Sequence, residues 1–340
     1  MDEHQLRQLI KPFTKPVLGR SIWQMINTLI PLAVLYALMG TAFVAGYWFV
    51  VLLLMIPAGA FMVRTFILFH DCTHMSFFKS QKANMIWGHI FGILTFTPYG
   101  AWRFEHNRHH GTVGNLDKRG IGDVWTMTVT EYLESGRFTR FIYRLYRNPV
   151  FLFFIAPFFL FGFLNRLPIR KMTKQEHVSM VITNLGLLLM AVLGSLWLGF
   201  WGYVFIQATT LYFAGVMGVW LFFVQHQFDE VYWQDNAHWE FTKAALAGSS
   251  FYKLPIVLDW ISGSIGFHHI HHLNPQIPNY NLRRCHKAVT TASDAVGLEP
   301  PYTVTFFKSF RLALLHLYDE ANGRLISFKT LARKHTLSNS

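Results

Sequence analysis

Histidines at helical spacing are the residues of this chain most able to do chemistry. The 340 residues include 17 His, and many of them fall in three short boxes, HDCTH, HNRHH and HHIHH. Two H-x-x-H-H triplets are expected by chance on the order of once in a thousand chains with this histidine content. The boxes supply eight candidate metal ligands: His70, His74, His106, His109, His110, His268, His271 and His272.

The spacing of the boxes explains how they can act together. Residues i, i+3 and i+4 share one face of a helix, so we expect each box to aim two or three imidazoles at one point. Neutral imidazole binds iron, copper, zinc and nickel. Eight such side chains exceed the needs of one ion, and the sequence therefore predicts two metal ions.

Further candidates surround the boxes. His226, in FFVQHQFDE, follows a long apolar tract directly and is predicted to be a ninth ligand. Asp71, Glu105 and Asp229 are candidates for accepting hydrogen bonds from ligand rings, with a solvated carboxylate as the alternative. His269 lies between box positions but on another helix face, so we expect it to support the ligands or to have no role at the site.

The apolar tracts predict a membrane protein. The chain is 52% hydrophobic and 14% charged, whereas soluble domains carry about 25% charged residues. Residues 21–63 and 177–228 contain no Asp, Glu, Lys or Arg, and each tract has room for two helices of about 20 residues. With turns near residues 45–46 and 199–202, the predicted fold is all-α and multi-pass, with four transmembrane helices in two hairpins.

Two shorter apolar segments, residues 83–102 and 149–164, are predicted to be interfacial or re-entrant. The second has cations on both flanks, whereas a spanning helix shows an imbalance of Lys and Arg between its ends. With four spans, every Lys and Arg except Arg64 falls on one side, which the positive-inside rule identifies as the cytoplasm. Arg64 is expected to snorkel from the inner end of the second span.

This topology divides the chain into five predicted regions and brings all three boxes to one face of the bilayer. The regions are a cytoplasmic N-terminus (1–20), a first hairpin (21–69), a cytoplasmic and interfacial region with boxes 1 and 2 (70–176), a second hairpin (177–228) and a cytoplasmic helical domain with box 3 (229–340).

Composition excludes several other classes. The net charge of +12 suits anionic lipid headgroups, and we find no nucleic-acid-binding motif. Two distant cysteines make no disulfide framework or zinc pattern, and the N-terminus does not look like a cleaved signal peptide. A metal transporter would place ionisable ligands within the spans, where this sequence has almost none. A regulatory membrane sensor is a weaker alternative.

The three boxes, in this order, resemble those of the membrane fatty acid desaturases. Further motifs are similar to bacterial acyl-lipid desaturases, with the Δ5 type the nearest, and the likeness covers roughly residues 30–280. These motifs are NLDKRGIGDVW (115–125), RLYRNP (144–149), VQHQFDE (224–230), GSSFYKLP (248–255) and HHLNPQIPNY (271–280).

The resemblance implies a non-haem di-iron centre that activates O₂ and introduces a cis double bond into a fatty acyl chain. The eight box histidines match the ligands of the family one by one, and His226 matches an additional ligand ahead of the third box. One position departs from the pattern. Animal members carry an Asn one helical turn before that ligand, touching a metal-bound water, whereas this chain has Phe222.

The resemblance also implies the partners. They are the acyl chains of membrane lipids, O₂ and a separate electron donor, since neither terminus shows a haem-binding domain; the bacterial likeness favours ferredoxin over cytochrome b5. The arginines at 137–147 either dock an acidic donor or lie on lipid headgroups. The expected location is the bacterial cytoplasmic membrane with the site on its cytoplasmic face. No side chain beyond the ligands is assigned a catalytic role, and a hydroxylase or ketolase of the same superfamily remains an alternative.

Overall fold

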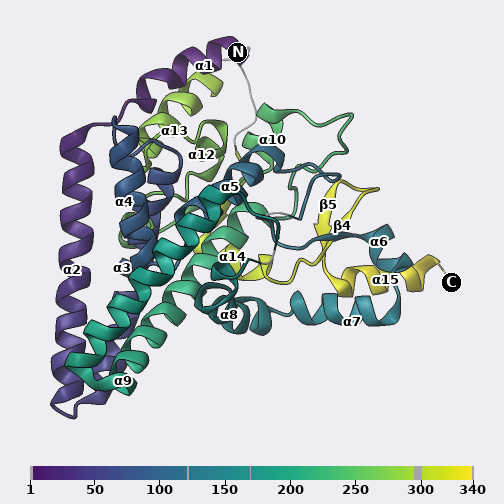
Figure 1. Ribbon diagram of the computed structural model, residues 1–340. Coiled ribbons are helices and arrows are strands. Elements are labelled where there is room, and N and C mark those ends of the chain that lie inside the picture. The colour runs from purple at the N-terminus through teal and green to yellow at the C-terminus, as the bar shows by residue number, and fades with distance from the viewer. Residues whose placement is uncertain (1–2, 121, 169, 295–300, 339–340) are drawn as a thin grey trace.

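The computed structural model describes residues 3–120, 122–168, 170–294 and 301–338, and helices make up most of this part of the chain. Figure 1 shows the long helices on one side of the molecule and the shorter helices and strands on the other. The helices are α1 (Glu3–Ile10), α2 (Leu18–Val44), α3 (Trp48–Thr73), α4 (Gln81–Leu94), α5 (Tyr99–Thr112), α6 (Val129–Glu134), α7 (Arg137–Tyr146), α8 (Ala156–Gly162), α9 (Lys174–His226), α10 (Phe241–Ala247), α11 (Ile256–Ile261), α12 (His268–Leu273), α13 (Asn279–Asp294), α14 (Phe306–Leu312) and α15 (Phe328–Ser338).

Three helices of the described chain, α2, α3 and α9, are long and apolar enough to cross a membrane. Their outer faces carry large apolar side chains that remain exposed, such as Trp23 (63%), Leu53 (70%) and Leu196 (80%). Contiguous apolar surface of this kind is unfavourable in water and is what a bilayer covers. The structure is therefore that of a membrane protein.

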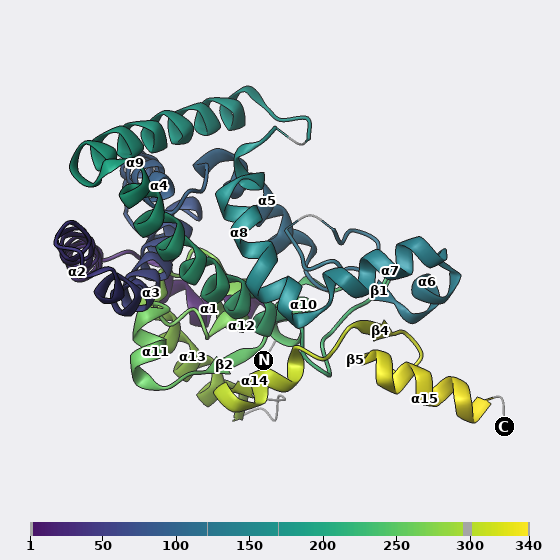
Figure 2. The same ribbon diagram turned by 90° about the horizontal axis from the view of Figure 1, so that it is seen from below.

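Helix α9 contains a break that turns it into two arms. Its 53 residues would extend about 80 Å if straight. At Gly199 the backbone has φ 70° and ψ 160°, which a residue with a Cβ adopts only at a high cost. The break falls inside the predicted turn at 199–202 and lies at the same end as the α2–α3 turn (Figure 1), and the two arms diverge from it (Figure 2).

The two segments predicted to be interfacial form short helices. Residues 83–102 fall on α4 and α5, which have 14 residues each and would extend only about 21 Å. Residues 149–164 fall on a π-helical turn, Phe151–Ile155, followed by α8. A bend of 60° separates this stretch from α7, as in a broken span or a re-entrant segment. Because α7 exposes Phe138 (76%) and Phe141 (62%) beside its arginines, it is amphipathic.

The all-α prediction needs correction, because short strands accompany the helices in the second half of the molecule and at residues 127–128. Strands β1 (Met127–Thr128), β4 (Leu317–Asp319) and β5 (Arg324–Ile326) form one sheet, with β1 parallel and β5 antiparallel to β4. Strands β2 (Phe251–Lys253) and β3 (Thr303–Thr305) pair in parallel. Strands of two or three residues are too short to show the apolar alternation that identifies a strand.

The prediction that Arg64 snorkels towards water was wrong. Arg64 is only 3% exposed, because its guanidinium group binds other helices. It donates hydrogen bonds to Thr28 Oγ1 (3.0 Å) and Asn27 Oδ1 (3.1 Å) of α2. It also donates to the backbone oxygen of Trp260 in α11 and lies 4.0 Å from the centre of that indole. Arg64 thus joins α2, α3 and α11.

Candidate metal centre

Four segments bring the candidate ligands together. His70 is on the last turn of α3 and His74 is the residue that ends that helix. The second box lies in the latter half of α5, and the third box forms α12. His226 is the last residue of α9. Since α3 and α9 are candidate spans, the site lies where apolar helices meet the rest of the protein.

The nine predicted histidines form two buried clusters, and each of them exposes 8% or less of its surface. Within each cluster the potential ligand atoms all lie within 4.8 Å of one another. One cluster has five members: His70, His74, His106, His110 and His271. The other has four: His109, His226, His268 and His272. The clusters are adjacent, because the rings of His110 and His272 stack with centroids 4.1 Å apart.

As predicted, two imidazoles of each H-x-x-H-H box share one cluster, while the third faces the other cluster. His106 and His110 face the five-histidine cluster, whereas His109 faces the other. In the third box, His268 and His272 face the four-histidine cluster, and His271 faces the five-histidine cluster. Neighbouring helix positions differ by about 100°, so an i, i+4 pair can share a target that the residue between them does not reach.

The distances between ring nitrogens fit a shared cation. In the five-histidine cluster the Nε2 atom of His106 lies 3.0 Å from that of His70 and 3.1 Å from that of His110. In the other, His226 Nε2 lies 3.1 Å from His109 Nε2 and 2.9 Å from His268 Nε2. Nitrogens bound at right angles to one ion at about 2.1 Å are about 3.0 Å apart, and at tetrahedral angles about 3.4 Å.

Unpaired ring nitrogens and neutral imidazoles also indicate that the clusters are metal sites. Within the described residues, His74 Nε2 and both ring nitrogens of His271 are buried without a hydrogen-bond partner, and such groups are costly unless something binds them. Burial also lowers the pKa of His106, His110 and His271 well below the usual 6.5. These rings are neutral at physiological pH, which leaves a lone pair available for a metal.

Sequence reasoning missed two groups that hold ligand rings in place. Asp123 Oδ1 lies 2.5 Å from His109 Nδ1, and His226 Nδ1 donates to the backbone oxygen of Gly248 at 3.2 Å. Gly122, with φ +73°, lets the loop approach, since a Cβ there would be 3.1 Å from His109 Cβ. The available signal was an acidic residue in the motif NLDKRGIGDVW, just after a box.

The carboxylates predicted to support ligands have other partners. Asp71 Oδ1 is 3.5 Å from His70 Nδ1, while its Oδ2 accepts from the backbone N and Nδ2 of Asn279 at 2.7 and 2.9 Å. Glu105 pairs with Arg170, and Asp229 accepts from the Tyr302 hydroxyl. The geometry thus leaves Asp71 beside a candidate ligand and directs the other two elsewhere.

His269 is buried outside both clusters. Its Nε2 lies 3.0 Å from Nδ1 of His286, and burial lowers its pKa to about 3. Phe222, the position at which the chain departs from animal desaturases, lines the four-histidine cluster. Its ring centroid is 5.3 Å from that of His109 and 5.1 Å from that of His226, so this side of the cluster is apolar.

Arg147 cannot take part in docking an electron donor, because the residue is 1% exposed. Its Nη2 donates to Gln227 Oε1 (2.9 Å) and to the backbone oxygen of Leu315 (2.7 Å). The side chain therefore connects the residue after His226 to the C-terminal region.

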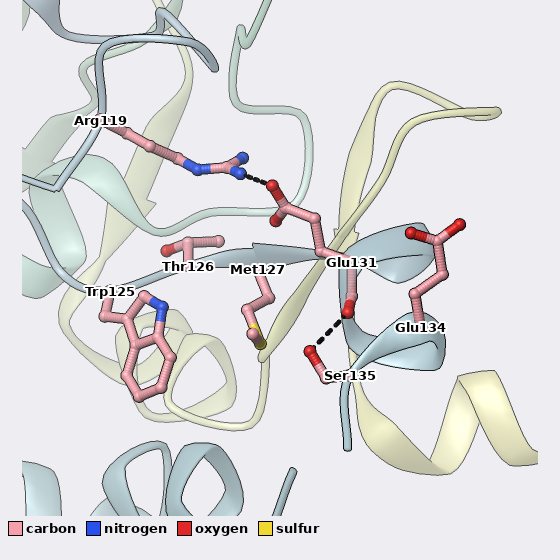
Figure 3. Close-up of a pocket in the computed structure, with 7 residues that line it drawn as sticks. All are labelled: Arg119, Trp125, Thr126, Met127, Glu131, Glu134 and Ser135. Atoms are coloured by element: carbon pink, nitrogen blue, oxygen red, sulfur yellow. Dashed lines mark hydrogen bonds and ion pairs between the residues drawn. The ribbon is translucent and has the colours of Figure 1, made fainter. Parts of the chain in front are cut away.

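A surface pocket near β1 and α6 is separate from the clusters (Figure 3). Arg119 and Glu131 form an ion pair on its wall, and the Ser135 hydroxyl donates to the Glu131 backbone oxygen at 2.7 Å. None of the nine histidines lines it.

Long apolar helices, with nine histidines buried in two clusters beside the ends of α3 and α9, define a membrane protein with groups that could hold metal ions. Comparison with known families makes this specific. The model of the family "Fatty acid desaturase" matches residues 45–302, and the chain belongs to this family.

Curated relatives agree with the family match. A "Fatty acid desaturase" of Bacillus subtilis (strain 168) is 39% identical over 329 residues, covering 97% of this chain and 92% of that protein. An "sn-1 acyl-lipid omega-3 desaturase (ferredoxin)" of Nostoc sp. (strain 36) is 28% identical over 294 residues, covering 81% and 76%. An "sn-1 oleoyl-lipid 12-desaturase" of Synechocystis sp. is 26% identical over 285 residues, covering 81% and 78%.

The family prediction is therefore confirmed. The chain is a fatty acid desaturase, an oxidoreductase that acts on fatty acids, and the transporter alternative is set aside. The names of these three relatives do not bear on the Δ5 resemblance, which stays a prediction.

Proposed function

We propose that this desaturase introduces a cis double bond into acyl chains of membrane lipids, using two iron ions, O₂ and two electrons from a separate protein. The observation that carries the proposal is the convergence of nine buried histidines from four distant segments into two adjacent clusters. The names of two relatives specify acyl-lipid or oleoyl-lipid desaturation, which supports a lipid-linked substrate.

The donor set favours iron over zinc. The five-histidine cluster offers one donor more than the four that structural zinc takes. Iron bound there would supply the redox chemistry, activating O₂ and removing two hydrogens from an unactivated carbon chain.

The residues of the chain hold and orient the site. The nine histidines are the proposed ligands, five for one ion and four for the other. Asp123 fixes the ring of His109 through Nδ1, and the Gly248 carbonyl fixes that of His226. Asp71, beside His70, is proposed to support the five-histidine cluster. Burial of all nine rings excludes bulk water, and Phe222 and Trp102 add apolar walls; the indole of Trp102 stacks on His106 at 4.1 Å.

We further propose four membrane passes, formed by α2, α3 and the two arms of α9. This proposal rests on the positions of His70 and His226 at the ends of the second and fourth passes, and both clusters would then lie at one side of the bilayer. The cation bias identifies that side as the cytoplasmic face of a bacterial membrane. The region boundaries predicted from the sequence follow from this topology and are part of the proposal.

Ferredoxin is the proposed electron donor, in preference to cytochrome b5, because the Nostoc relative carries ferredoxin in its name. The arginines of α7 are better placed for lipid than for the donor. Arg137 and Arg140 alternate with exposed Phe138 and Phe141, a pattern that embeds a helix at a membrane surface.

Lipid analysis tests the proposal. The chain is expressed with ferredoxin and its reductase in a host whose acyl chains are saturated, and lipids are examined by mass spectrometry that locates double bonds. We expect oxygen-dependent unsaturation at one position, absent in His271→Ala. Hydroxylated chains in place of unsaturated ones would identify a hydroxylase instead, and unaltered lipids with iron and donor present would refute the proposal.

A further inference from the structure

Two short helices after the last span, α11 and α14, carry apolar faces that the histidine site does not explain. Ile256 is 82% exposed, Val257 70% and Phe307 81%. Helix α14 begins at residue 306, beyond the end of the family match at residue 302. Exposed apolar groups of this size mark an interaction surface.

A pair of parallel strands sets the direction of both helices. Strand β2 pairs with β3 from Phe251↔Thr303 to Lys253↔Thr305, and each strand leads into one of the helices, β2 into α11 and β3 into α14. Parallel strands end at the same edge, so the two helices begin there together. Figure 2, a view from the end of the α2–α3 turn, shows α11 beside α3 and α14 near the second arm of α9.

Contacts with the spanning helices show where α11 and α14 lie along the spans, measured from the histidines at the span ends. The Trp260 ring of α11 meets Phe61 of α3 edge-on at 5.9 Å, and the Phe310 ring of α14 lies 5.1 Å from Trp220 of α9. Phe61 precedes His70 by nine residues and Trp220 precedes His226 by six. At 1.5 Å per residue, the contacts lie about 13 and 9 Å from the histidines, towards the middle of the spans.

The opposite side of α14 is fixed to the protein. Leu312 is 1% exposed, and the Tyr252 hydroxyl donates to Ser309 Oγ at 3.0 Å. Lys308 Nζ lies 4.1 Å from the centre of the Tyr302 ring, and Arg311 is exposed. The helix therefore presents apolar groups outward with cations beside them, which is the composition of helices that lie in the surface of an anionic bilayer.

We propose that α11 and α14 form a membrane-embedded pair that attaches the C-terminal half of the chain to the same leaflet as the histidine clusters. Ile256, Val257 and Phe307 lie among acyl chains, and Lys308 and Arg311 lie at the level of lipid phosphates. Because α11 is joined to α3 through Arg64 and directly precedes the third box, this attachment fixes the depth of that box relative to the bilayer.

Spin labels on the full-length protein test this inference without any need for activity. Val257→Cys and Phe307→Cys are labelled with a nitroxide and reconstituted in vesicles of phosphatidylcholine and phosphatidylglycerol. Labelled wild type measures the background, since Cys72 and Cys285 are both buried. Leu53→Cys, at a residue 70% exposed on α3, is the reference for lipid, and Glu320→Cys, at an exposed residue after β4, is the reference for water.

Power saturation with O₂ and with a water-soluble nickel chelate then reports the surroundings of each label. We expect both test labels to match the Leu53 label, with high access to O₂ and low access to nickel. Access like that of the Glu320 label, at either position, would overturn the inference. Labels shielded from both reagents would also overturn it, because a protein partner would then cover the helices.

Discussion

Replacing Asp123 by Asn removes a negative charge that faces His109 Nδ1 across 2.5 Å while keeping an acceptor at the same place. The His109 side chain is 0% exposed and that of Asp123 is 13% exposed, so solvent screens the pair poorly. Since His109 belongs to the four-histidine cluster, the change should weaken metal binding at that cluster alone.

The size of the effect follows from the type of hydrogen bond. A bond to a charged group contributes about 1.5–3 kcal/mol and a neutral one about 0.5–1.5 kcal/mol, so Asn should lose roughly 1.4 kcal/mol, or tenfold in affinity. Ala removes the acceptor as well, and its loss should approach the hundredfold limit of about 2.7 kcal/mol known for partners of metal ligands.

Anaerobic titration of the metal-free protein with Fe(II), against a competing chelator, measures both binding steps. We expect one step to weaken about tenfold in Asp123→Asn and about a hundredfold in Asp123→Ala, with the other step unchanged. Asp229→Asn is the matched control, because its carboxylate accepts from the Tyr302 hydroxyl. Equal weakening of both steps, or none, would refute the reasoning.

Three further predictions concern other residues. His271→Ala should lose unsaturation and about half of the bound iron, whereas His238→Ala, at an exposed residue, should keep both; full activity of His271→Ala by lipid analysis would contradict this. Arg147→Met removes the hydrogen bonds to Gln227 Oε1 and to the backbone oxygen of Leu315 and should lower Tm by roughly 5–10 °C in a thermal melt; an unchanged Tm would show that these bonds contribute nothing. Burial, with help from Arg147 and Arg144, lowers the pKa of His316 from 6.5 to about 4. Between these two pH values the unfolded chain binds more protons than the folded chain, so the free energy of unfolding rises with pH across that window. The Tm of His316→Asn should therefore depend less on pH than the Tm of wild type. Parallel plots of Tm against pH for the two proteins would argue against this.

The eight box histidines could be found from the sequence because box spacing is a local property of a helix, and His226 because it directly follows a long apolar tract. Their division into five and four could not, since it depends on how α3, α5, α9 and α12 cross. Asp123 escaped notice for a related reason, as it reaches His109 only because the loop bends at Gly122. The histidines on one face of one helix were therefore predictable. The contacts between side chains of separate segments were not.

The same distinction holds for the fold. The charge-free tracts predicted the apolar helices and the break near Gly199, since length and composition decide both. The short strands were missed because pairing with distant residues, such as Lys253 with Thr305, defines them. Arg64 and Arg147 were expected at a surface because charged side chains usually lie there. Instead, both are buried, and their guanidinium groups donate hydrogen bonds to carbonyl and amide oxygens of neighbouring segments.

The metal content of the purified, active protein tests the central claim most directly. Elemental analysis together with Mössbauer spectroscopy of protein grown on enriched iron should find two iron ions per chain in nitrogen-rich surroundings, with unsaturation rising in proportion to iron. A fully active protein that contains one ion per chain, or zinc in place of iron, would contradict the assignment of two histidine clusters to two irons.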